Sequence, residues 1–495
     1  MSAPREMLDY IEDAQSKGFS DDAIKEALRI AGWHKKDISQ AFPQETTSNS
    51  QTISPPIIFI SILLFLFLGL GSAYGVFWYQ SHPQSTISPT PKPTESLSPG
   101  THATPTPTDT TLNDETQTAS VSTELSYAHN ALGFSIIKEL QKTEEDKNIV
   151  LSPTSIALAL SMTYNGASDS TKLAMAKTMK IIGLDVKKLN TDSAELIKLL
   201  ANPDPRVTLT IANSIWARKG ITFLPEFLSI NKTYYNAQIQ SLDFSVPSAA
   251  DTINGWVSKN TKGKIPTIVE KPIDASIVMY LINAVYFYGS WTNEFDATLT
   301  KMRDFTLLAN TKIQHLFMEQ HRTDFLYQET SAFQAILLPY GKNKQLSMVI
   351  LLPKTSLTSF LGQLTHATWN SWMKSFSEME GTLFLPKFKT EFKTSLKKSL
   401  STLGMTTAFS DTADFSNMRK QKDLLISDVI HKTFIEVSEK GTEAAAATSV
   451  GMAFTSFSEP KPTFVMEVNK PFFFAIIDTS SSEILFMGII KNPTK

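Results

Sequence analysis

The chain of 495 residues contains no cysteine and carries a formal net charge of only -2. Without thiols it can form no disulfide, thiolate metal site or cysteine nucleophile, so its stability depends on burial alone. The near balance of acidic and basic residues gives no reason to expect nucleic acid as a partner. The eight histidines form no HExxH motif or close cluster, and the sequence has no GxSxG or P-loop motif. We therefore expect no metal and no cofactor, and nothing indicates an enzyme.

Residues 1–43 have the pattern of a small helical unit. Pro4 and Ser20 suit helix starts, and Gly18 and Gly32 suit helix ends. The unit resembles the three-helix segments found at the cytoplasmic end of some bacterial membrane proteins. A solvated helical tail is the alternative, because so short a segment is only marginally stable alone.

Residues 57–79 form an uncharged stretch rich in Ile, Leu, Phe and Gly that ends in Trp78 and Tyr79. At a rise of about 1.5 Å per residue, a helix of this length can cross ~30 Å of hydrocarbon. A cleavable signal peptide is the competing interpretation, but its apolar core would be shorter and would begin closer to the N-terminus. We therefore predict a transmembrane helix.

The charges around this stretch predict its orientation. Several Lys and Arg residues precede it, whereas Lys92 is the only Lys or Arg between it and residue 120. The bias favours a single-pass protein of the cell membrane with a cytoplasmic N-terminus and everything after Tyr79 outside. Residues 80–121 are rich in Pro, Thr and Ser, a composition that builds no core, so we expect an extended linker there.

Residues 122–495 have the apolar patterning of a globular domain. The pattern predicts a helix over Leu125–Leu140, with further helices interspersed among short β-rich runs. Strands without regular alternation with helices indicate the α+β class. The predicted strands are Val207–Ser214, Ser276–Phe287, Ala335–Leu338, Leu346–Leu352, Gly381–Lys387, Phe434–Val437 and Phe473–Asp478.

A series of short segments in this domain occurs in the order that is typical of one protein family. The segments are Asn148–Ile156, Tyr164–Ala167, Ala212–Trp216, Leu224–Phe227, Ile253–Val257, Thr261–Ile265, Leu281–Phe287, Leu385–Phe388, His431–Lys432, Ile435–Val437, Gly441–Thr448 and Asn469–Phe472. Together they resemble the serpin (serine protease inhibitor) family over essentially all of residues 123–495. The resemblance implies a serpin fold, with three β-sheets, surrounding helices and an exposed reactive loop.

The resemblance also implies a mechanism. A serine protease attacks the reactive loop and forms an acyl-enzyme, and the cut loop then inserts into the main sheet as an added strand. Insertion carries the protease away and distorts its active site before the acyl bond is hydrolysed. We expect such a suicide-substrate inhibitor, displayed on the outer face of a membrane. The alternative is a non-inhibitory serpin that acts as a binding or structural surface protein.

The segment that would become the added strand alternates in a way that suits this role. Helix propensity alone would favour a helix through its alanines. As a strand, in which alternate side chains point to opposite sides, the segment has two faces. The face that begins with Thr442 carries no charge, and the only charged residue, Glu443, begins the other face. Small, uncharged side chains avoid desolvation costs on burial. The predicted hinge consists of Glu439, Gly441, Thr442, Glu443, Ala444, Ala445, Ala446, Ala447 and Thr448.

Counting from the hinge glutamate, as in inhibitory serpins, places the scissile bond between Thr455 and Ser456. Phe454 and Phe457 are alternative positions. No Arg or Lys lies between Gly441 and Pro460, which disfavours a trypsin-like target. Elastase-like, subtilisin-like or chymotrypsin-like proteases, which prefer small or aromatic residues, fit this loop better.

Five further positions match the family's machinery for opening the main sheet. Ser152, Ser155, Asn283 and His431 match the shutter beneath the sheet, and Trp291 matches the breach where the loop first enters. A sheet that opens needs polar contacts that can be exchanged, because an unpaired buried donor is costly. The alternative is a purely structural network beside an ordinary core tryptophan.

Overall fold

The computed structural model describes residues 122–201, 203–442 and 463–495, and a few residues nearer the N-terminus: Ile11, Lys25, Ser39, Ala41 and Phe42. The chain divides into two units, Met1–Thr111 and Leu112–Lys495. The predicted membrane span and linker, and nearly all of the predicted helical unit, lie outside the described residues. Within the described part of the chain, no helix combines the length and apolar character needed to cross a membrane.

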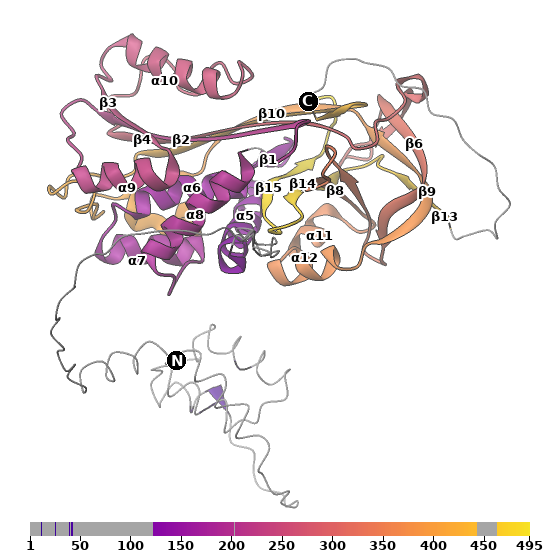
Figure 1. Ribbon diagram of the computed structural model, residues 1–495, viewed down its shortest axis with the longest axis horizontal. Helices are drawn as coiled ribbons and strands as arrows, with labels where there is room; N and C mark the ends of the chain where they lie inside the picture. Colours follow the sequence, from indigo (N-terminus) through magenta and orange to yellow (C-terminus); the bar gives the residue numbers. More distant parts are fainter. Residues whose placement is uncertain are drawn as a thin grey trace, which may run out of the picture. The chain divides into compact units, whose positions relative to one another are not determined.

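Helices cover both faces of the main sheet in the second unit (Figure 1). Helix α6 (Pro153–Tyr164) packs against the inner face, and α10 (Pro247–Asn260) packs against the outer face. Ser152 caps α6 by accepting a hydrogen bond from the backbone of Ser155. The other α-helices described are α5 (Thr123–Thr143), α7 (Asp169–Met179), α8 (Val186–Leu200), α9 (Pro225–Tyr235), α11 (Leu357–Gln363), α12 (His366–Met373) and α13 (Lys397–Leu400).

The main sheet has six strands in the order β10-β11-β12-β4-β2-β3. Their bounds are β2 (Val207–Arg218), β3 (Gln238–Leu242), β4 (Met279–Ser290), β10 (Phe388–Ser395), β11 (Asp428–Ser438) and β12 (Gly441–Thr442). Strands β2 and β4 pair antiparallel along nearly their whole length. Strand β4 is a nearly continuous apolar run because helices cover both of its faces.

The remaining strands form a second, nine-stranded network in the order β1-β15-β14-β8-β7-β6-β9-β13, with β5 paired to β6. Their bounds are β1 (Ile149–Leu151), β5 (Lys301–Thr306), β6 (Lys312–Glu329), β7 (Phe333–Pro339), β8 (Leu346–Pro353), β9 (Ser377–Pro386), β13 (Thr463–Glu467), β14 (Phe472–Asp478) and β15 (Ile484–Ile490). The serpin resemblance implied three sheets, whereas the described strands form two hydrogen-bonded networks. The long strand β6 accounts for the difference, because it pairs with β5 at one end and β7 at the other.

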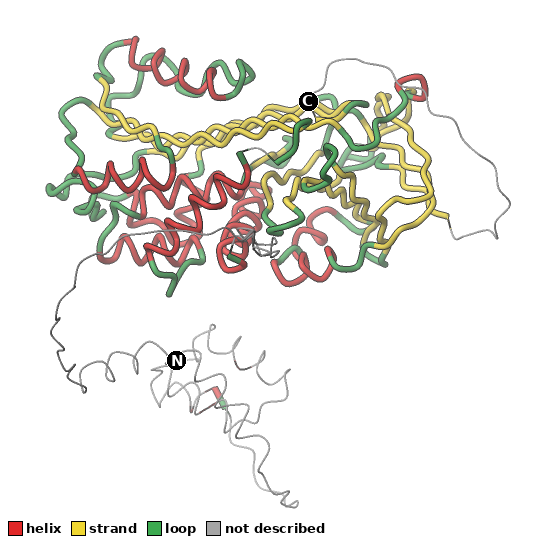
Figure 2. Tube along the Cα trace, in the orientation of Figure 1, coloured by secondary structure: helices red, strands yellow, loops and turns green. Residues whose placement is uncertain are grey.

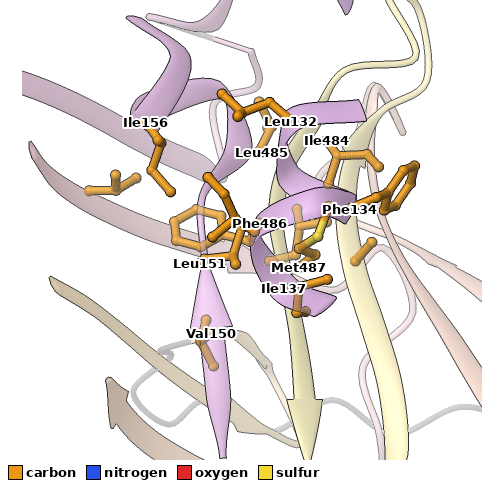
Figure 3. Packing of buried hydrophobic residues seen from close by; sticks show 14 of the residues in the cluster. Leu132, Phe134, Ile137, Val150, Leu151, Ile156, Ile484, Leu485, Phe486 and Met487 are labelled. Carbon is orange, nitrogen blue, oxygen red and sulfur yellow. The ribbon is translucent and has the colours of Figure 1, made fainter. Parts of the chain in front are cut away.

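Two apolar clusters hold the sheets and helices together. In the larger, side chains of α5 and α6 interdigitate with those of β1 and β15 (Figure 3). Leu132, Ile137, Leu151 and Phe486 are among its completely or almost completely buried members, each stabilising the fold by about 1.5–3 kcal/mol. The smaller cluster lies between α10 and the outer face of the main sheet.

The predicted helix over Leu125–Leu140 and the predicted strands are confirmed, as α5, β2, β4, β7, β8, β9, β11 and β14 (Figure 2). Strand β4 begins at Met279, later than predicted, because Asp274 holds the preceding residues in a turn by accepting from the backbone of Ser276. The sequence did not predict β1, β3, β5, β6, β10, β12, β13 and β15, although β15 is buried throughout. Strand β1 has only three residues, and β3 is polar and largely exposed, so neither has a recognisable apolar period.

Candidate functional site

The main sheet contains a seam between β4 and β11. These strands pair in parallel from Tyr280 opposite Asp428 to Ala284 opposite Lys432. Beyond Ala284 they separate, and the short strand β12 lies between them, antiparallel to both. Strand β12 consists of the predicted hinge residues Gly441 and Thr442. One end of the seam is therefore already occupied by the start of a strand.

Gly441 occupies a position that accepts no side chain. Its φ of 145° lies in a region that other residues rarely adopt. A Cβ atom there would lie 2.0 Å from the carbonyl oxygen of Gly289 and 2.7 Å from the Cα of Ser290. Both are backbone atoms of β4, so the sheet would have to move to relieve the clash.

Thr442 is anchored by a buried hydroxyl pair. The side chain is 1% exposed, and its Oγ1 lies 2.7 Å from the phenol oxygen of Tyr340, which is completely buried. Burial raises the pKa of Tyr340 well above its ordinary value, so the phenol keeps its proton and can donate it. The ring of Tyr340 stacks on Trp291 with centroids 4.4 Å apart. The first inward-facing hinge residue thus has a preformed polar partner in an otherwise aromatic pocket.

Trp291, the predicted breach residue, organises the turn between β11 and β12. Its indole Nε1 donates to the carbonyl of Ser438 at 2.9 Å, and its backbone N–H donates to the carbonyl of Lys440 at 2.8 Å. The backbone of Phe295 donates to the carbonyl of Glu439 at 2.8 Å. This one short segment after β4 therefore fixes the chain just before it enters the sheet.

Glu439 forms the polar part of the same region. Its carboxylate accepts from Lys387 Nζ at 2.9 and 3.0 Å and from Thr300 Oγ1 at 2.9 Å. Burial alone would raise the pKa of Glu439, but these hydrogen bonds outweigh burial and hold the pKa below its ordinary value. The carboxylate is therefore charged at neutral pH and ties β11 to the segments that carry Lys387 and Thr300.

The structure brings the predicted shutter residues together beneath the seam. His431 and Asn283 are register partners, with His431 Nδ1 lying 2.9 Å from Asn283 Oδ1. The backbone N–H of Ser152 donates to His431 Nε2 at 3.2 Å, so Nδ1 carries the imidazole proton. Burial lowers the pKa of His431 to about 3, and the ring is neutral.

The Asn283 amide links this histidine to α6. Its Nδ2 donates to the carbonyl of Ser155 at 2.9 Å, contacts the Ser155 hydroxyl, and donates to Asn213 Oδ1 at 2.6 Å. All of these side chains are buried. The network joins the two strands of the seam to the helix beneath them. Its role in opening the sheet stays a prediction.

The structure adds residues that the sequence did not assign to the site: Asn213, Thr300, Tyr340 and Lys387. Asn213 and Lys387 lie in segments that carry the serpin resemblance, which was the only available signal for them. No sequence signal marked Thr300 or Tyr340, because their hydrogen-bond partners are far away in the sequence. The described residues stop at Thr442 and resume at Thr463. The predicted scissile bond and the hinge beyond Thr442 therefore lie outside them.

Comparisons with known proteins identify the family. Residues 127–493 match the family model described as serpin (serine protease inhibitor). The leukocyte elastase inhibitor of Bos taurus is 35% identical over 386 residues, covering 75% of this chain and 100% of the relative. Iripin-8 of Ixodes ricinus is 33% identical over 380 residues, covering 74% of this chain and 93% of the relative.

Solved structures agree on the fold. The thermophilic serpin tengpin in its native state is 34% identical with a TM-score of 0.69, covering 75% of this chain and 95% of that chain. Human thyroxine-binding globulin is 28% identical with a TM-score of 0.70, covering 76% of this chain and 100% of that chain. On the family match and these relatives, the chain belongs to the serpin family of serine protease inhibitors.

Proposed function

We propose that this protein inhibits serine proteases as a suicide substrate. Strand β12 carries the proposal, because Gly441 and Thr442 already pair with both β4 and β11. The chain that follows Thr442 can therefore extend an existing strand. When a protease has formed an acyl-enzyme with the loop and cut it, further extension would pull the protease along the sheet before hydrolysis. The protease supplies the nucleophile, so the serpin itself is not an enzyme.

We propose proteases that prefer small or aromatic residues as targets, and cleavage at Thr455–Ser456. The absence of Arg and Lys between Gly441 and Pro460 disfavours a trypsin-like target. The relatives include several proteins named leukocyte elastase inhibitor, which supports an elastase-like target. Subtilisin-like and chymotrypsin-like proteases are the other candidates.

A non-inhibitory serpin is the competing function. Thyroxine-binding globulin, whose solved complex contains thyroxine, shows that proteins of this fold can bind ligands. The short run Ala444–Ala447 favours inhibition, because it offers neither bulk nor charge to oppose entry into the sheet.

The test is to incubate the full-length chain with elastase, subtilisin, chymotrypsin and trypsin. We expect a band at the summed mass on denaturing gels with at least one of the first three, and no such band with trypsin, because the loop has no Arg or Lys between Gly441 and Pro460. Mass spectrometry of the released C-terminal fragment should place its first residue at Ser456. Cleaved product alone with every protease, with full protease activity remaining, would rule out inhibition.

We further propose that residues 57–79 anchor the protein in the cell membrane, with the serpin domain outside and residues 1–43 inside. The length and uncharged character of this stretch support the proposal. Protease added to intact cells should release the serpin domain and leave residues 1–43 protected. If the serpin domain is protected instead, the topology is the reverse of the proposed one. If the whole chain is soluble, residues 57–79 are not a membrane anchor.

A further inference from the structure

A cavity of about 360 Å³ lies at the end of the main sheet that is farthest from β12. Tyr280 of β4 and Asp428 of β11, the register partners at that end of the ladder, both line it. Residues of the segment 268–274, between α10 and β4, and of the end of β10 form the remaining walls. The volume is within the range of roughly 300–1,000 Å³ that is typical of small-molecule sites. None of the hinge, shutter or breach residues lines this cavity.

One wall of the cavity is held in shape by α10. The Asn254 side chain accepts from the backbone N–H groups of Ile268 and Val269 at 2.9 and 3.0 Å, and it donates to the carbonyl of Val269 at 2.9 Å. Ile268 and Val269 are buried and belong to the smaller apolar cluster, as does Ile430 of β11, which also lines the cavity. The cavity therefore has a rigid, apolar part that packing within the protein already fixes.

The rest of the lining is mainly acidic. Three carboxylates line the cavity, those of Glu270, Asp274 and Asp428, and Lys393 is the only cation among the lining residues. Lys393 Nζ lies 2.9 Å from Glu270 Oε1, so these two charges offset each other. The carboxylates of Asp274 and Asp428 are left without an ion-pair partner among the described residues. The cavity thus carries an excess of negative charge.

Each of these two carboxylates has one oxygen to spare. Asp274 Oδ1 accepts from the backbone and hydroxyl of Ser276, and these hydrogen bonds lower the pKa of Asp274. Asp428 Oδ1 accepts from the hydroxyl of Ser395 and from the backbone of Val429. Arg218 also acts on Asp274, but its guanidinium donates to backbone carbonyls of residues 274, 275 and 277. Within the described part of the chain, Oδ2 of both aspartates accepts no hydrogen bond.

Tyr280 adds a hydroxyl that bonds to no described residue. The residue is only 7% exposed, and its ring packs on Phe244 with centroids 5.8 Å apart. Burial raises the pKa of Tyr280, and the nearby carboxylates of Asp428 and Asp274 raise it further, so the phenol keeps its proton. Hydroxyls in such buried side chains are normally hydrogen-bonded. The phenol oxygen is therefore an acceptor that an N–H group in the cavity can use.

We propose that this cavity binds a small organic cation. The ammonium or guanidinium group of the ligand donates to the spare oxygens of Asp274 and Asp428 and to the phenol oxygen of Tyr280. Its apolar body packs against Ile268 and Ile430. Hydrogen bonds from a cation to carboxylates are stronger than bonds between neutral groups, so the positive charge is what selects the ligand.

A bound cation would also hold this end of the β4–β11 ladder closed. Tyr280 and Asp428 belong to the two strands of the ladder, and a ligand that contacts both opposes their separation. Under the proposed function the strands must separate for the loop to insert, so the ligand should slow inhibition. This consequence rests on the suicide-substrate function, whereas the binding itself does not.

Phenethylamine is a suitable probe, because it joins one ammonium group to an apolar ring. Titration of the full-length chain, followed by ligand-observed NMR, gives its Kd. Phenethyl alcohol and hydrocinnamate keep the ring but are neutral and anionic, and they should bind at least about tenfold more weakly. Equal affinities for the amine and the alcohol would overturn the proposal.

Variants locate the binding site. Asp274→Asn should weaken phenethylamine binding at least about fivefold, because it removes a charge while its amide oxygen can keep the turn with Ser276. Asp296→Asn is the matched control, since Asp296 makes the same turn with Thr298 but does not line the cavity. It should leave the affinity unchanged. Tyr280→Phe should weaken binding by roughly two- to tenfold, as expected for one hydrogen bond. Unchanged affinity in both cavity variants would overturn the site.

The effect on inhibition is measured with a protease that the parent protein traps. Saturating phenethylamine should slow complex formation by the parent and by Asp296→Asn, and it should have a smaller effect on Asp274→Asn. Binding at the cavity without slower inhibition would overturn the regulatory role. Failure of every protease to form a complex, with or without the amine, would instead overturn the proposed function and leave the binding result intact.

Discussion

At the scale of single residues, the hinge depends on Gly441. Gly441→Ala should expel β12 from the seam, because the new Cβ would meet backbone atoms of Gly289 and Ser290. We expect a loss of roughly 1–3 kcal/mol from backbone strain, with a further loss from the clash. The thermal midpoint of the native protein measures the loss.

Gly220→Ala is the matched control. Gly220 also has a positive φ, of 96°, but no heavy atom lies within 4 Å of its ideal Cβ position. It should therefore show the strain without the clash and a smaller fall in thermal midpoint. Equal losses in the two variants would mean that β12 is not held in the seam.

His431 predicts a pH dependence. Its pKa is about 3 in the folded protein and about 6.5 when unfolded, so between these values the unfolded chain binds a proton that the folded chain does not. Between these two pKa values, the free energy of unfolding should fall by roughly 1.4 kcal/mol for each unit by which the pH is lowered. Above about pH 7 the titration of His431 should no longer affect stability. Denaturant unfolding at a series of pH values measures the slope.

His431→Gln removes the titration while keeping a neutral hydrogen-bonding side chain. Whatever the absolute stability of this variant, its free energy of unfolding should depend less steeply on pH between about pH 4 and 6 than that of the parent. The difference in slope should correspond to the uptake of one proton on unfolding. Identical slopes in both proteins would show that His431 is not the buried neutral group described here.

At the scale of elements, a charged substitution tests whether Thr442 of β12 lies on the inward face of the main sheet. Thr442→Arg places a charge beside the buried Tyr340 and Val437, where an unpaired charge costs several kcal/mol. Under the proposed function, insertion competes with hydrolysis of the acyl-enzyme, so slower insertion would let the protease escape. We expect a sharp rise in the number of inhibitor molecules consumed per protease molecule inactivated.

Glu443→Arg is the control for this charge. The alternation predicted from the sequence puts Glu443 on the outward face, and Tyr288 and Glu436, next to the partners of Thr442, are only partly buried. The substitution should therefore change charge without deep burial. The consumption ratio should stay close to that of the parent. The same ratio for both variants would contradict the assignment of Thr442 to the inward face.

Elements with a strong apolar period could be predicted from the sequence, whereas long-range partners could not. Strand β8 is buried throughout and is an almost continuous apolar run, and α6 begins with a proline directly after a serine cap. The bond between Tyr340 and Thr442 joins residues 102 positions apart. Neither residue type is unusual where it stands, so only the folded chain shows that they meet.

The shutter network also contains a long-range contact that could not be predicted from the sequence. Ser152, Ser155, Asn283 and His431 were assigned from resemblance, and the structure shows them in contact. Asn213 completes the network from β2, and its place follows from its pairing with Asn283 across the sheet. That register depends on tertiary structure, which local propensity does not encode.

At the scale of the whole molecule, the proposed function requires a main sheet that can accept one more strand. Among the described strands, β12 pairs with β4 and β11 at one end of the seam, and the β4–β11 ladder closes the other end. Under the proposed function the native fold is stable for kinetic reasons, because a more stable arrangement with a full central strand would be reached only after the loop is cut.

The measurement that tests this account most directly is the melting temperature before and after one cut between residues 443 and 462. The account predicts a marked rise after the cut, because insertion adds a strand with hydrogen bonds on both sides and buries its inward face. The intact chain serves as the reference under identical conditions. A melting temperature that is unchanged or lower after the cut would contradict the claim that the loop becomes the central strand of the main sheet.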